Sequence, residues 1–277
     1  MILSSSLFPY SRRSTVSETQ QSSRLPHRVR NELAIRPVTV ISKAFIAGQF
    51  YRVEVGGEAL KGFSSAGFDD HVKLFFPDAE TGELQLPTIT PEGVEWPAGA
   101  RPAARDYTPL SFDAEKGLLT LDFYLHEAGL ASDWAVQAKP GDKLAVGGPR
   151  GSLVVPEDYA FQLYVCDETG LPAFRRRMQT MSGQTLKLFA WADEAAGQAY
   201  LGDVGAVEVT WLGSGKINAV AVKELIARFD EITLPDDDYF IWLTGEGEAV
   251  KTLRDYFITL REREAERVRA VAYWHQK

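Results

Sequence analysis

The chain has 277 residues, 45% hydrophobic and 25% charged, which is enough for two globular domains and excludes disorder throughout. Its formal net charge of −8 argues against a nucleic-acid binder. One cysteine and four histidines exclude a disulfide framework and argue against a Cys-rich or multi-His metal centre, so we expect no bound metal. No apolar stretch reaches the roughly 18 residues of a membrane helix, and we expect a cytoplasmic protein without a membrane partner.

The N-terminal segment differs from the rest of the chain. It is rich in serine, and its first 36 residues hold six arginines but only two glutamates. It also lacks sustained hydrophobic periodicity, which predicts a disordered tail over residues 1–34. An organelle transit peptide is the alternative interpretation of such an Arg- and Ser-rich start.

From Ile35 the pattern is typical of strands. Short β-branched or aromatic runs are separated by Gly, Pro and Asp, which favours an antiparallel Greek-key β-barrel over residues 35–152. The expected strands cover 37–46, 50–55, 71–76, 105–112, 118–126 and 142–148. One helical stretch, residues 131–139, interrupts them, and Ser132 near its start can cap it.

Beyond an expected linker at residues 153–158, the pattern alternates between strand and helix. Such alternation predicts an α/β domain with a parallel sheet over residues 159–277. The expected strands are 161–167, 185–193, 207–213, 238–246 and 269–275, and the expected helices are 171–181, 221–229 and 249–268. This two-domain layout is that of the ferredoxin-reductase superfamily, in which the barrel holds a flavin and the second domain holds a nicotinamide nucleotide.

The first motif that fits this layout is Arg105-Asp106-Tyr107-Thr108 on an expected barrel strand. Arg105 can make charge-assisted bonds to a pyrophosphate, Tyr107 lies on the same strand face, and the Thr108 hydroxyl can reach a flavin ring nitrogen. An ordinary strand with an exposed arginine and a half-buried tyrosine is the alternative interpretation.

The second motif is Gly129-Leu130-Ala131-Ser132, which leads directly into the expected helix. A helix start offers free backbone N–H groups and a positive dipole end to an anion such as a pyrophosphate. Taken alone, Gly129 is equally well a turn residue and Ser132 an N-cap.

Two acidic segments follow expected parallel strands, Asp167-Glu168-Thr169 and Gly245-Glu246. The carboxyl ends of such strands form the crevice where open α/β sheets bind ligands, although both segments could be ordinary helix caps. Asp193 and Glu194 after the second strand favour NADH over NADPH, because a carboxylate accepts from a ribose hydroxyl but repels a 2′-phosphate.

Several blocks together resemble the siderophore-interacting protein family, which comprises flavin-dependent ferric-siderophore reductases. They are "RDYTPLSFD", "LTLDFYLHEAGLASDWA", "GDKLAVGGPRGS", "CDETGLPAF", "WLTGEGEAVKTLRDY" and "AYWH", in the family's order from about residue 35 to the C-terminus. The resemblance implies FAD as cofactor, with NADH, NADPH or ferredoxin as electron donor. It implies a ferric siderophore, for example a catecholate, as substrate, and a monomeric protein.

The resemblance also implies the residues of each site, with the flavin rather than a catalytic side chain carrying the chemistry. The expected cofactor-binding residues are Arg105, Asp106, Tyr107, Thr108, Asp122, His126, Gly129, Ala131, Ser132, Trp134, Asp167, Glu168, Thr169, Gly245 and Glu246. The expected siderophore-binding residues are Lys73, Arg254, His275 and Lys277. His126 could instead be a structural histidine of an apolar strand.

Four departures from the family pattern bear on nucleotide and substrate binding: Leu110, Cys166, Ala272 and His275. We interpret Cys166 as a buried small hydrophobe, since its strand is apolar. Two other functions stay open on the sequence. One is a general flavin or ferredoxin-type reductase that acts on a protein partner, and the other is a siderophore- or flavin-binding protein without turnover.

Overall fold

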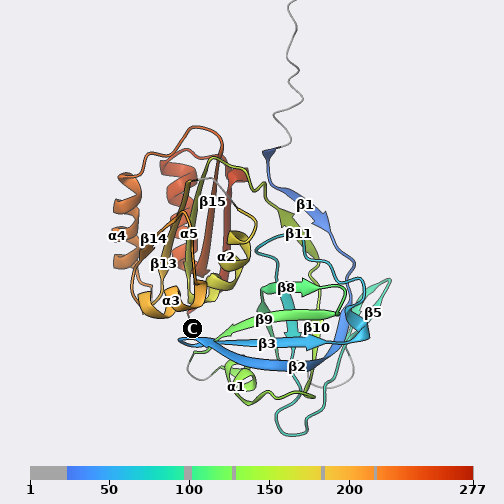
Figure 1. The fold of residues 1–277 in the computed structure, drawn as a ribbon. Coiled ribbons are helices and arrows are strands. Elements are labelled where there is room, and N and C mark those ends of the chain that lie inside the picture. Colours follow the sequence, from blue (N-terminus) through green and yellow to red (C-terminus); the bar gives the residue numbers. More distant parts are fainter. Residues whose placement is uncertain (1–23, 97–101, 127–128, 182–184, 215–216, 277) are drawn as a thin grey trace, which may run out of the picture.

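A computed structural model of the chain describes residues 24–96, 102–126, 129–181, 185–214 and 217–276 (Figure 1). These residues form the two expected units, an antiparallel barrel and a parallel α/β sheet, which lie side by side with the carboxyl ends of the parallel strands toward the barrel. None of the helices that they form is long and apolar enough to cross a membrane.

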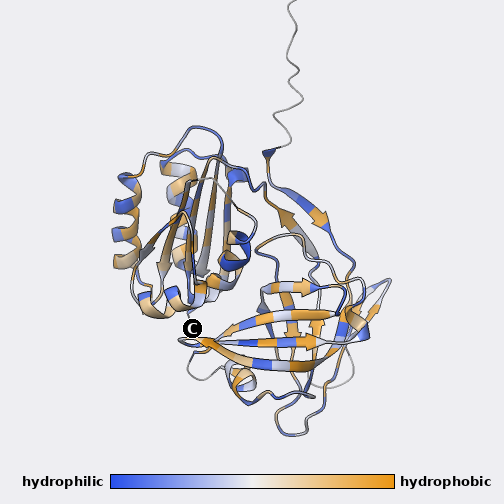
Figure 2. Cartoon of the chain, in the orientation of Figure 1, coloured by the Kyte–Doolittle hydropathy of each residue, from blue (hydrophilic) through white to orange (hydrophobic). Residues whose placement is uncertain are grey.

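The barrel sheet has the strand order β7-β4-β10-β2-β3-β9-β8, and every pair in it is antiparallel. Its strands are β2 (Ile35–Ala47), β3 (Phe50–Gly56), β4 (Val72–Phe75), β7 (Ala104–Tyr107), β8 (Pro109–Asp113), β9 (Leu118–Tyr124) and β10 (Lys143–Gly147). Figure 2 shows hydrophobic and hydrophilic residues alternating along these strands, as one buried face requires. The chain passes from β3 to β4 across β2 and β10, which is the expected Greek-key connectivity.

One segment closes the barrel. β7 and β8 lie at opposite ends of the strand order, yet only Thr108 separates them in the sequence. Residues 104–113 therefore pair with β4 at one end and with β9 at the other. The Arg105–Thr108 motif lies in this closing segment.

Some short strands were not expected from the sequence. β1 (His27–Arg30) falls within the predicted tail and pairs with β11 (Gly151–Val154). The four residues of β1 are all exposed, so this strand depends on its backbone partner and not on an apolar pattern. β5 (Thr88–Thr90) and β6 (Gly93–Glu95) form a small hairpin, while residues 1–23 lie outside the described part of the chain.

The parallel sheet has the order β14-β13-β12-β15-β16. Its strands are β12 (Phe161–Asp167), β13 (Thr185–Trp191), β14 (Val207–Trp211), β15 (Tyr239–Glu246) and β16 (Val268–Trp274). Every residue of β12 and β15 is buried, as central strands covered on both faces require. The strand order changes direction between β12 and β15, so a topological switch point lies between the ends of these two strands.

Helices cover both faces of this sheet. α2 (Leu171–Met178) and α3 (Glu194–Leu201) pack on one face, and α4 (Ala219–Asp230) and α5 (Gly247–Asp255) pack on the other. α3 was not expected, because its eight residues carry only a weak apolar pattern. The buried Cys166 belongs to the first of these faces, where burial raises the pKa of its thiol well above the usual value.

The single long helix expected at 249–268 is wrong. α5 ends at Asp255, a π-helical turn follows at Tyr256–Leu260, and Glu262 adopts a positive φ of 51°. The Arg261 guanidinium donates to the carbonyl oxygen of Phe229 and to the Tyr256 hydroxyl, which fixes this turn against α4. The charge run that looked like a solvated helix face instead leads the chain back into β16.

The two domains share an apolar core. Ala47, Phe50 and Phe68 of the barrel belong to the same buried cluster as the α2 and α3 face of the sheet. The ring of Phe50 stacks on that of Tyr200, with centroids 3.8 Å apart and an interplanar angle of 19°. Asp69 of the barrel accepts from Arg269 Nε of β16 at 2.8 Å. These contacts set the position of one domain relative to the other.

Candidate functional site

The candidate flavin-binding face begins with Arg105 and Tyr107, which share one side of β7 because strand side chains alternate. The Tyr107 ring packs on Phe123, with centroids 4.3 Å apart, and Phe123 packs on Trp134 of α1 (Leu130–Gln137) at 5.8 Å. Burial raises the pKa of the Tyr107 hydroxyl, so this ring is a neutral platform. The Arg105 guanidinium is exposed, and among the described residues it hydrogen-bonds only to the carbonyl of Ala104.

The N-terminus of α1 is a second candidate contact for the cofactor. Its N-cap is Gly129, and no side chain caps its first N–H groups. Ser132, expected to cap the helix, lies inside its first turn, and its hydroxyl accepts from the backbone N–H of His126 at 3.2 Å. Ser132 and Ala131 are buried and therefore shape the turn, while the first backbone N–H groups of the helix are the anion donors.

His126 packs against Gly129. A Cβ on Gly129 would lie 2.4 Å from Cε1 of the imidazole, so a larger residue there would displace the ring. The His126 side chain is exposed. It thus borders the open helix start, and its direct contact with a cofactor stays a prediction.

Thr108 is buried where the closing segment bends, near the buried hydroxyl of Tyr273 of β16. Trp274, the next residue, donates from Nε1 to Asp167 Oδ2 at 2.6 Å. The C-terminal strand therefore links the barrel motif to the acidic loop after β12. Neither aromatic residue was a predicted site residue, although both belong to the "AYWH" block.

Asp122 has a different role from the expected cofactor contact. Its side chain is fully buried, Arg52 binds both its oxygens at 2.8 Å, and the Tyr200 hydroxyl donates to Oδ2 at 2.7 Å. Tyr200 comes from α3, so this carboxylate joins the two domains. Its oxygens are engaged by protein groups, and we do not retain it as a cofactor ligand.

Lys73 and Asp106 neutralise each other. They are cross-strand neighbours on β4 and β7, and Lys73 Nζ lies 2.7 Å from Asp106 Oδ1. Both side chains are about half exposed, so the ion pair is a surface one. Asp106 lies on the strand face opposite Arg105 and Tyr107, which separates it from the candidate flavin face.

At the switch point, Asp167 is almost fully buried and holds the loop together. Its Oδ1 accepts from the backbone N–H of Thr169 at 2.9 Å and from the Thr169 hydroxyl at 2.5 Å, and its Oδ2 accepts from Trp274. Burial raises the pKa of Asp167, and these hydrogen bonds oppose the rise. Asp167 and Thr169 therefore shape the crevice.

Glu168 follows β12 directly and is partly buried. Burial, with the nearby Asp167 carboxylate, raises the pKa of Glu168 to about 7, and the Tyr124 hydroxyl opposes this rise. Burial and the Glu168 carboxylate also raise the pKa of Tyr124 to about 12.

On the neighbouring strand, Glu246 is the N-cap of α5 and accepts from the backbone N–H groups of Glu248 and Ala249 at 2.8 and 3.0 Å. Gly245 has a φ of 135°, and a Cβ there would lie 3.0 Å from Asp167 Oδ2. The alternative interpretation as a helix cap thus fits Glu246. The glycine allows β12 and β15 to approach at the crevice.

The expected siderophore residues of the second domain lie apart. His275 is exposed beside Gly247 at the start of α5, whereas Arg254 lies in the last turn of that helix, about 10 Å along its axis. Arg254 is also paired with Asp255 at 3.7 Å. Lys277 lies outside the described residues. His275 therefore remains near the crevice, and Arg254 is the weaker candidate.

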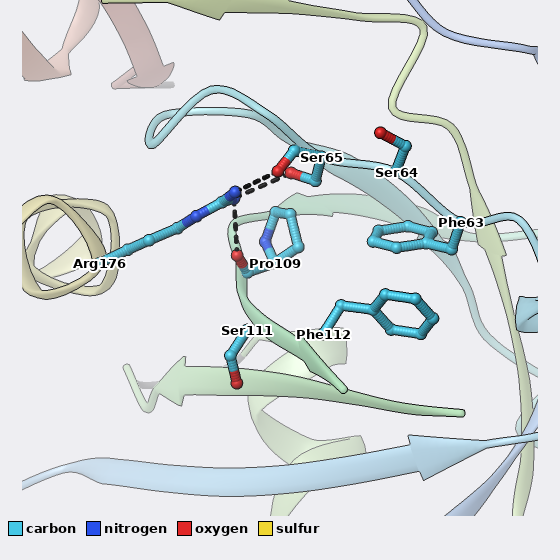
Figure 3. Close-up of a pocket in the computed structure, with 7 residues that line it drawn as sticks. All are labelled: Phe63, Ser64, Ser65, Pro109, Ser111, Phe112 and Arg176. Carbon is cyan, nitrogen blue, oxygen red and sulfur yellow. Dashed lines mark hydrogen bonds between the residues drawn. The ribbon is translucent and has the colours of Figure 1, made fainter. Parts of the chain in front are cut away.

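A hollow of about 320 Å³ adjoins the closing segment (Figure 3). It is lined by Phe63, Ser64, Ser65, Pro109, Ser111, Phe112 and Arg176. Arg176 of α2 reaches across to donate to the Pro109 carbonyl at 3.0 Å and the Ser65 hydroxyl at 2.8 Å. Sequence reasoning missed Arg176, because its partners lie 67 and 111 residues away.

These donors fit FAD. The barrel domain offers an exposed guanidinium at Arg105, an uncapped helix N-terminus at α1, and the rings of Tyr107 and Trp134, which pack against the barrel core. The first two groups suit a pyrophosphate, and the rings suit a planar heterocycle. The crevice between β12 and β15 is the corresponding position for a nicotinamide nucleotide.

Comparison with known proteins agrees with this geometry. A siderophore-interacting FAD-binding domain matches residues 39–153, and a siderophore-interacting protein domain matches residues 159–277. The NADPH-dependent ferric-chelate reductase of Escherichia coli is 49% identical, over 92% of this chain and 98% of its own length. The ferric vibriobactin reductase ViuB of Vibrio cholerae is 27% identical, over 86% and 89%. The structure of a siderophore utilization protein from T. fusca aligns with a TM-score of 0.80 and 31% identity, over 91% and 96%.

Proposed function

Since the chain belongs to the siderophore-interacting protein family, we propose that it is an FAD-dependent reductase that uses NADPH to reduce ferric siderophores and release Fe(II). The observation that supports this proposal is that one chain combines the Arg105–Thr108 motif and an uncapped α1 N-terminus on the barrel with a switch point of the parallel sheet. When bound, FAD supplies hydride acceptance from NADPH and single-electron transfer to ferric iron, which no side chain can supply.

The barrel residues bind and orient the cofactor. Arg105 and the first N–H groups of α1 neutralise the pyrophosphate, and Tyr107, held by Phe123, orients the ring system. Thr108, buried at the bend of the closing segment, supplies a hydroxyl near Tyr273 of the second domain. Siderophore oxygens are hard ligands that bind Fe(II) less tightly than Fe(III), so reduction frees the iron.

NADPH is the donor that we favour. The E. coli relative is named for it, and the acidic residues that favoured NADH have another explanation. Asp193 is the N-cap of α3, and its side chain accepts from the backbone N–H of Ala196 at 2.9 Å. Its position therefore follows from helix capping and carries no information about the 2′-phosphate.

We propose an anionic catecholate as the siderophore class. Arg175 of α2 supports this choice, because its Nη1 is buried without a hydrogen-bond partner in the described residues and its guanidinium lies 5.0 Å from the Tyr200 ring centroid. This cation supplies positive charge to an otherwise acidic protein. The electron path lies between domains of one chain, so a monomer is sufficient. A reducing cytoplasm is the compartment that we favour, because the single cysteine is a buried free thiol.

An anaerobic spectral titration tests the proposed function. NADPH is added to the flavin-loaded protein, followed by a ferric catecholate with a ferrous-iron trap. We expect the flavin band to bleach and then return as trapped Fe(II) appears. If NADPH and NADH leave the flavin oxidised, and reduced ferredoxin bleaches it, the electron donor is a protein and not a nucleotide. Failure to bind any flavin would refute the proposal.

A further inference from the structure

The closing segment of the barrel has a weak point at its bend, directly after the flavin motif. Thr108 belongs to neither β7 nor β8. Pro109 has no backbone N–H to donate to a neighbouring strand, and the pairing of β8 with β9 shifts register between Pro109 and Ser111. Because the regular ladder is interrupted here, the neighbouring strands hold the backbone beside Thr108 less firmly than the rest of the segment.

Arg176 of α2 binds this bend from the other domain. Its Nη1 donates to the Pro109 carbonyl oxygen at 3.0 Å and to the Ser65 hydroxyl at 2.8 Å (Figure 3). Its Nη2 donates to the carbonyl oxygen of Ser65. A planar guanidinium with several fixed donors can bind such a set of acceptors at once. One side chain of the second domain thus holds two barrel segments, the bend and the loop before β4.

The Ser65 hydroxyl connects Arg176 with a buried carboxylate. It donates to Asp70 Oδ2 at 2.8 Å. The same carboxylate oxygen accepts from the backbone N–H of Gly67 at 3.0 Å and from the Ser152 hydroxyl at 2.6 Å. Asp70 is buried, so these protein groups, and not water, fix its position. The partners of Arg176 in the loop before β4 are therefore held in place themselves.

The other end of α2 lies at the nucleotide crevice. The helix begins at Leu171, directly after the crevice loop. A Cβ on Gly170 would lie 2.6 Å from Cβ of Cys166 and 2.6 Å from Cγ2 of Thr244, so the helix start is packed tightly against β12 and β15. Arg176 follows about 9 Å further along the helix axis. α2 is therefore a short rigid link between the switch point and the bend beside Thr108.

We propose that Arg176 is a positioning residue for hydride transfer. By holding the Pro109 carbonyl, it fixes the Thr108 end of the flavin motif relative to the nucleotide crevice. This inference rests on the proposed function. Transfer between two bound groups depends steeply on their placement, and an error of about 1 Å can slow it about 100-fold. Arg176 acts through the backbone of the closing segment and donates no group to the reaction.

Other contacts hold the domains together independently of Arg176. The next residue, Arg177, donates to the Val155 carbonyl of the linker at 3.1 Å and to the Gln162 side chain at 3.0 Å. Phe50 stacks on Tyr200 at the shared core. Replacement of Arg176 leaves these contacts in place, so it should displace the bend without separating the domains.

Amide hydrogen exchange over residues 104–113 of the flavin-free, full-length protein gives the first test. Arg176→Met keeps an apolar side chain but removes the donors, and exchange in this segment should become about tenfold faster as the charge-assisted bonds are lost. Arg176→Lys keeps the charge and a point donor and should give intermediate exchange. Arg228→Met is the matched control, because Arg228 is an exposed arginine in the last turn of α4, and its exchange should equal that of the wild type. Unchanged exchange in Arg176→Met would overturn the inference.

Anaerobic stopped-flow reduction of the flavin-loaded variants gives the second test. With saturating NADPH, Arg176→Met should bleach about tenfold more slowly than the wild type, and Arg176→Lys should recover part of the rate. The NADPH concentration for half-maximal rate should stay unchanged. Dithionite, a small reductant that needs no alignment of domains, should reduce all variants equally fast.

The outcomes separate this inference from the proposed function. A wild-type rate with NADPH in Arg176→Met, or an equal slowing with NADPH and dithionite, would overturn the positioning role and leave the reductase intact. A wild-type flavin that dithionite reduces and NADPH does not would overturn both.

Discussion

The barrel face and the sheet crevice both carry polar motifs, but the two regions differ in whether those polar groups are already hydrogen-bonded within the protein. On the barrel face, the Arg105 guanidinium and the α1 N-terminus have no side-chain partner in the described structure. In the crevice, Asp167 and Glu246 accept hydrogen bonds from their own domain. Polar groups left open bind a ligand, whereas polar groups that are already paired determine the shape of a site. Four experiments can break or sharpen this comparison.

The largest effect is expected at Asp122, which fixes the two regions relative to each other. Asp122→Ala leaves Arg52 and the Tyr200 hydroxyl without their shared acceptor in a buried position. Breaking one side of a buried ion pair costs about 3 kcal/mol. We expect this loss in the free energy of unfolding from urea denaturation, with the flavin released as the domains separate. A variant of wild-type stability would show that the domains are held by their apolar contacts alone.

Next in size is the effect of Arg105→Ala on flavin binding. Loss of a charge-assisted bond of about 2 kcal/mol weakens binding about 30-fold. Flavin fluorescence titration measures the Kd, and the unfolding midpoint of the apoprotein should stay unchanged because Arg105 is exposed. Arg28→Ala, an exposed arginine of β1, serves as control and should bind flavin normally. Equal affinities of Arg105→Ala and the control would remove the barrel face as the flavin site.

A smaller, pH-dependent effect is expected at Glu168. Its pKa is raised from 4.5 to about 7 in the folded protein, so between these values the folded chain keeps a proton that the unfolded chain has released. Wild-type stability therefore falls as pH rises from about 4.5 to 7 and levels off above. Glu168→Gln should lack this contribution. Its thermal unfolding temperature should therefore rise relative to that of the wild type as pH increases from about 4.5 to 7. If stability depends on pH in the same way in the two proteins, Glu168 titrates like a solvated carboxyl and its pKa is not raised.

The smallest effect is expected at Lys73. Its charge is balanced by Asp106 in an exposed ion pair, and such pairs contribute at most about 1 kcal/mol. Lys73→Ala should leave thermal stability nearly unchanged and alter the KM for a ferric catecholate by no more than about threefold. A tenfold rise in KM with unchanged kcat would restore Lys73 as a siderophore contact and show that Asp106 releases it.

The sequence was sufficient for the features that depend on local pattern. Short β-branched and aromatic runs between Gly, Pro and Asp predicted the barrel strands, and the alternation of strand and helix predicted the parallel sheet. It also placed Asp167 and Glu168 at the crevice, because a parallel strand end that precedes a helix has one position in such a sheet.

Features that depend on distant partners could not be predicted. Asp122 and Tyr200 are 78 residues apart, and Asp167 and Trp274 are 107 apart. The end of α5 likewise depends on Arg261, whose carbonyl and hydroxyl partners form only when α4 packs nearby. In each case a side chain that looks available in the sequence is already paired in the fold.

The closing segment of the barrel has a dynamic consequence. Residues 104–113 both complete the hydrogen-bonded ring of strands and present the flavin motif, with the bend at Thr108 as the junction. A ligand bound to this closing segment opposes fluctuations that open the barrel, because opening would break the contacts of the ligand. Amide hydrogen exchange along β4 and β9 should therefore slow when the flavin site is occupied. The cofactor would thus stabilise the barrel that binds it.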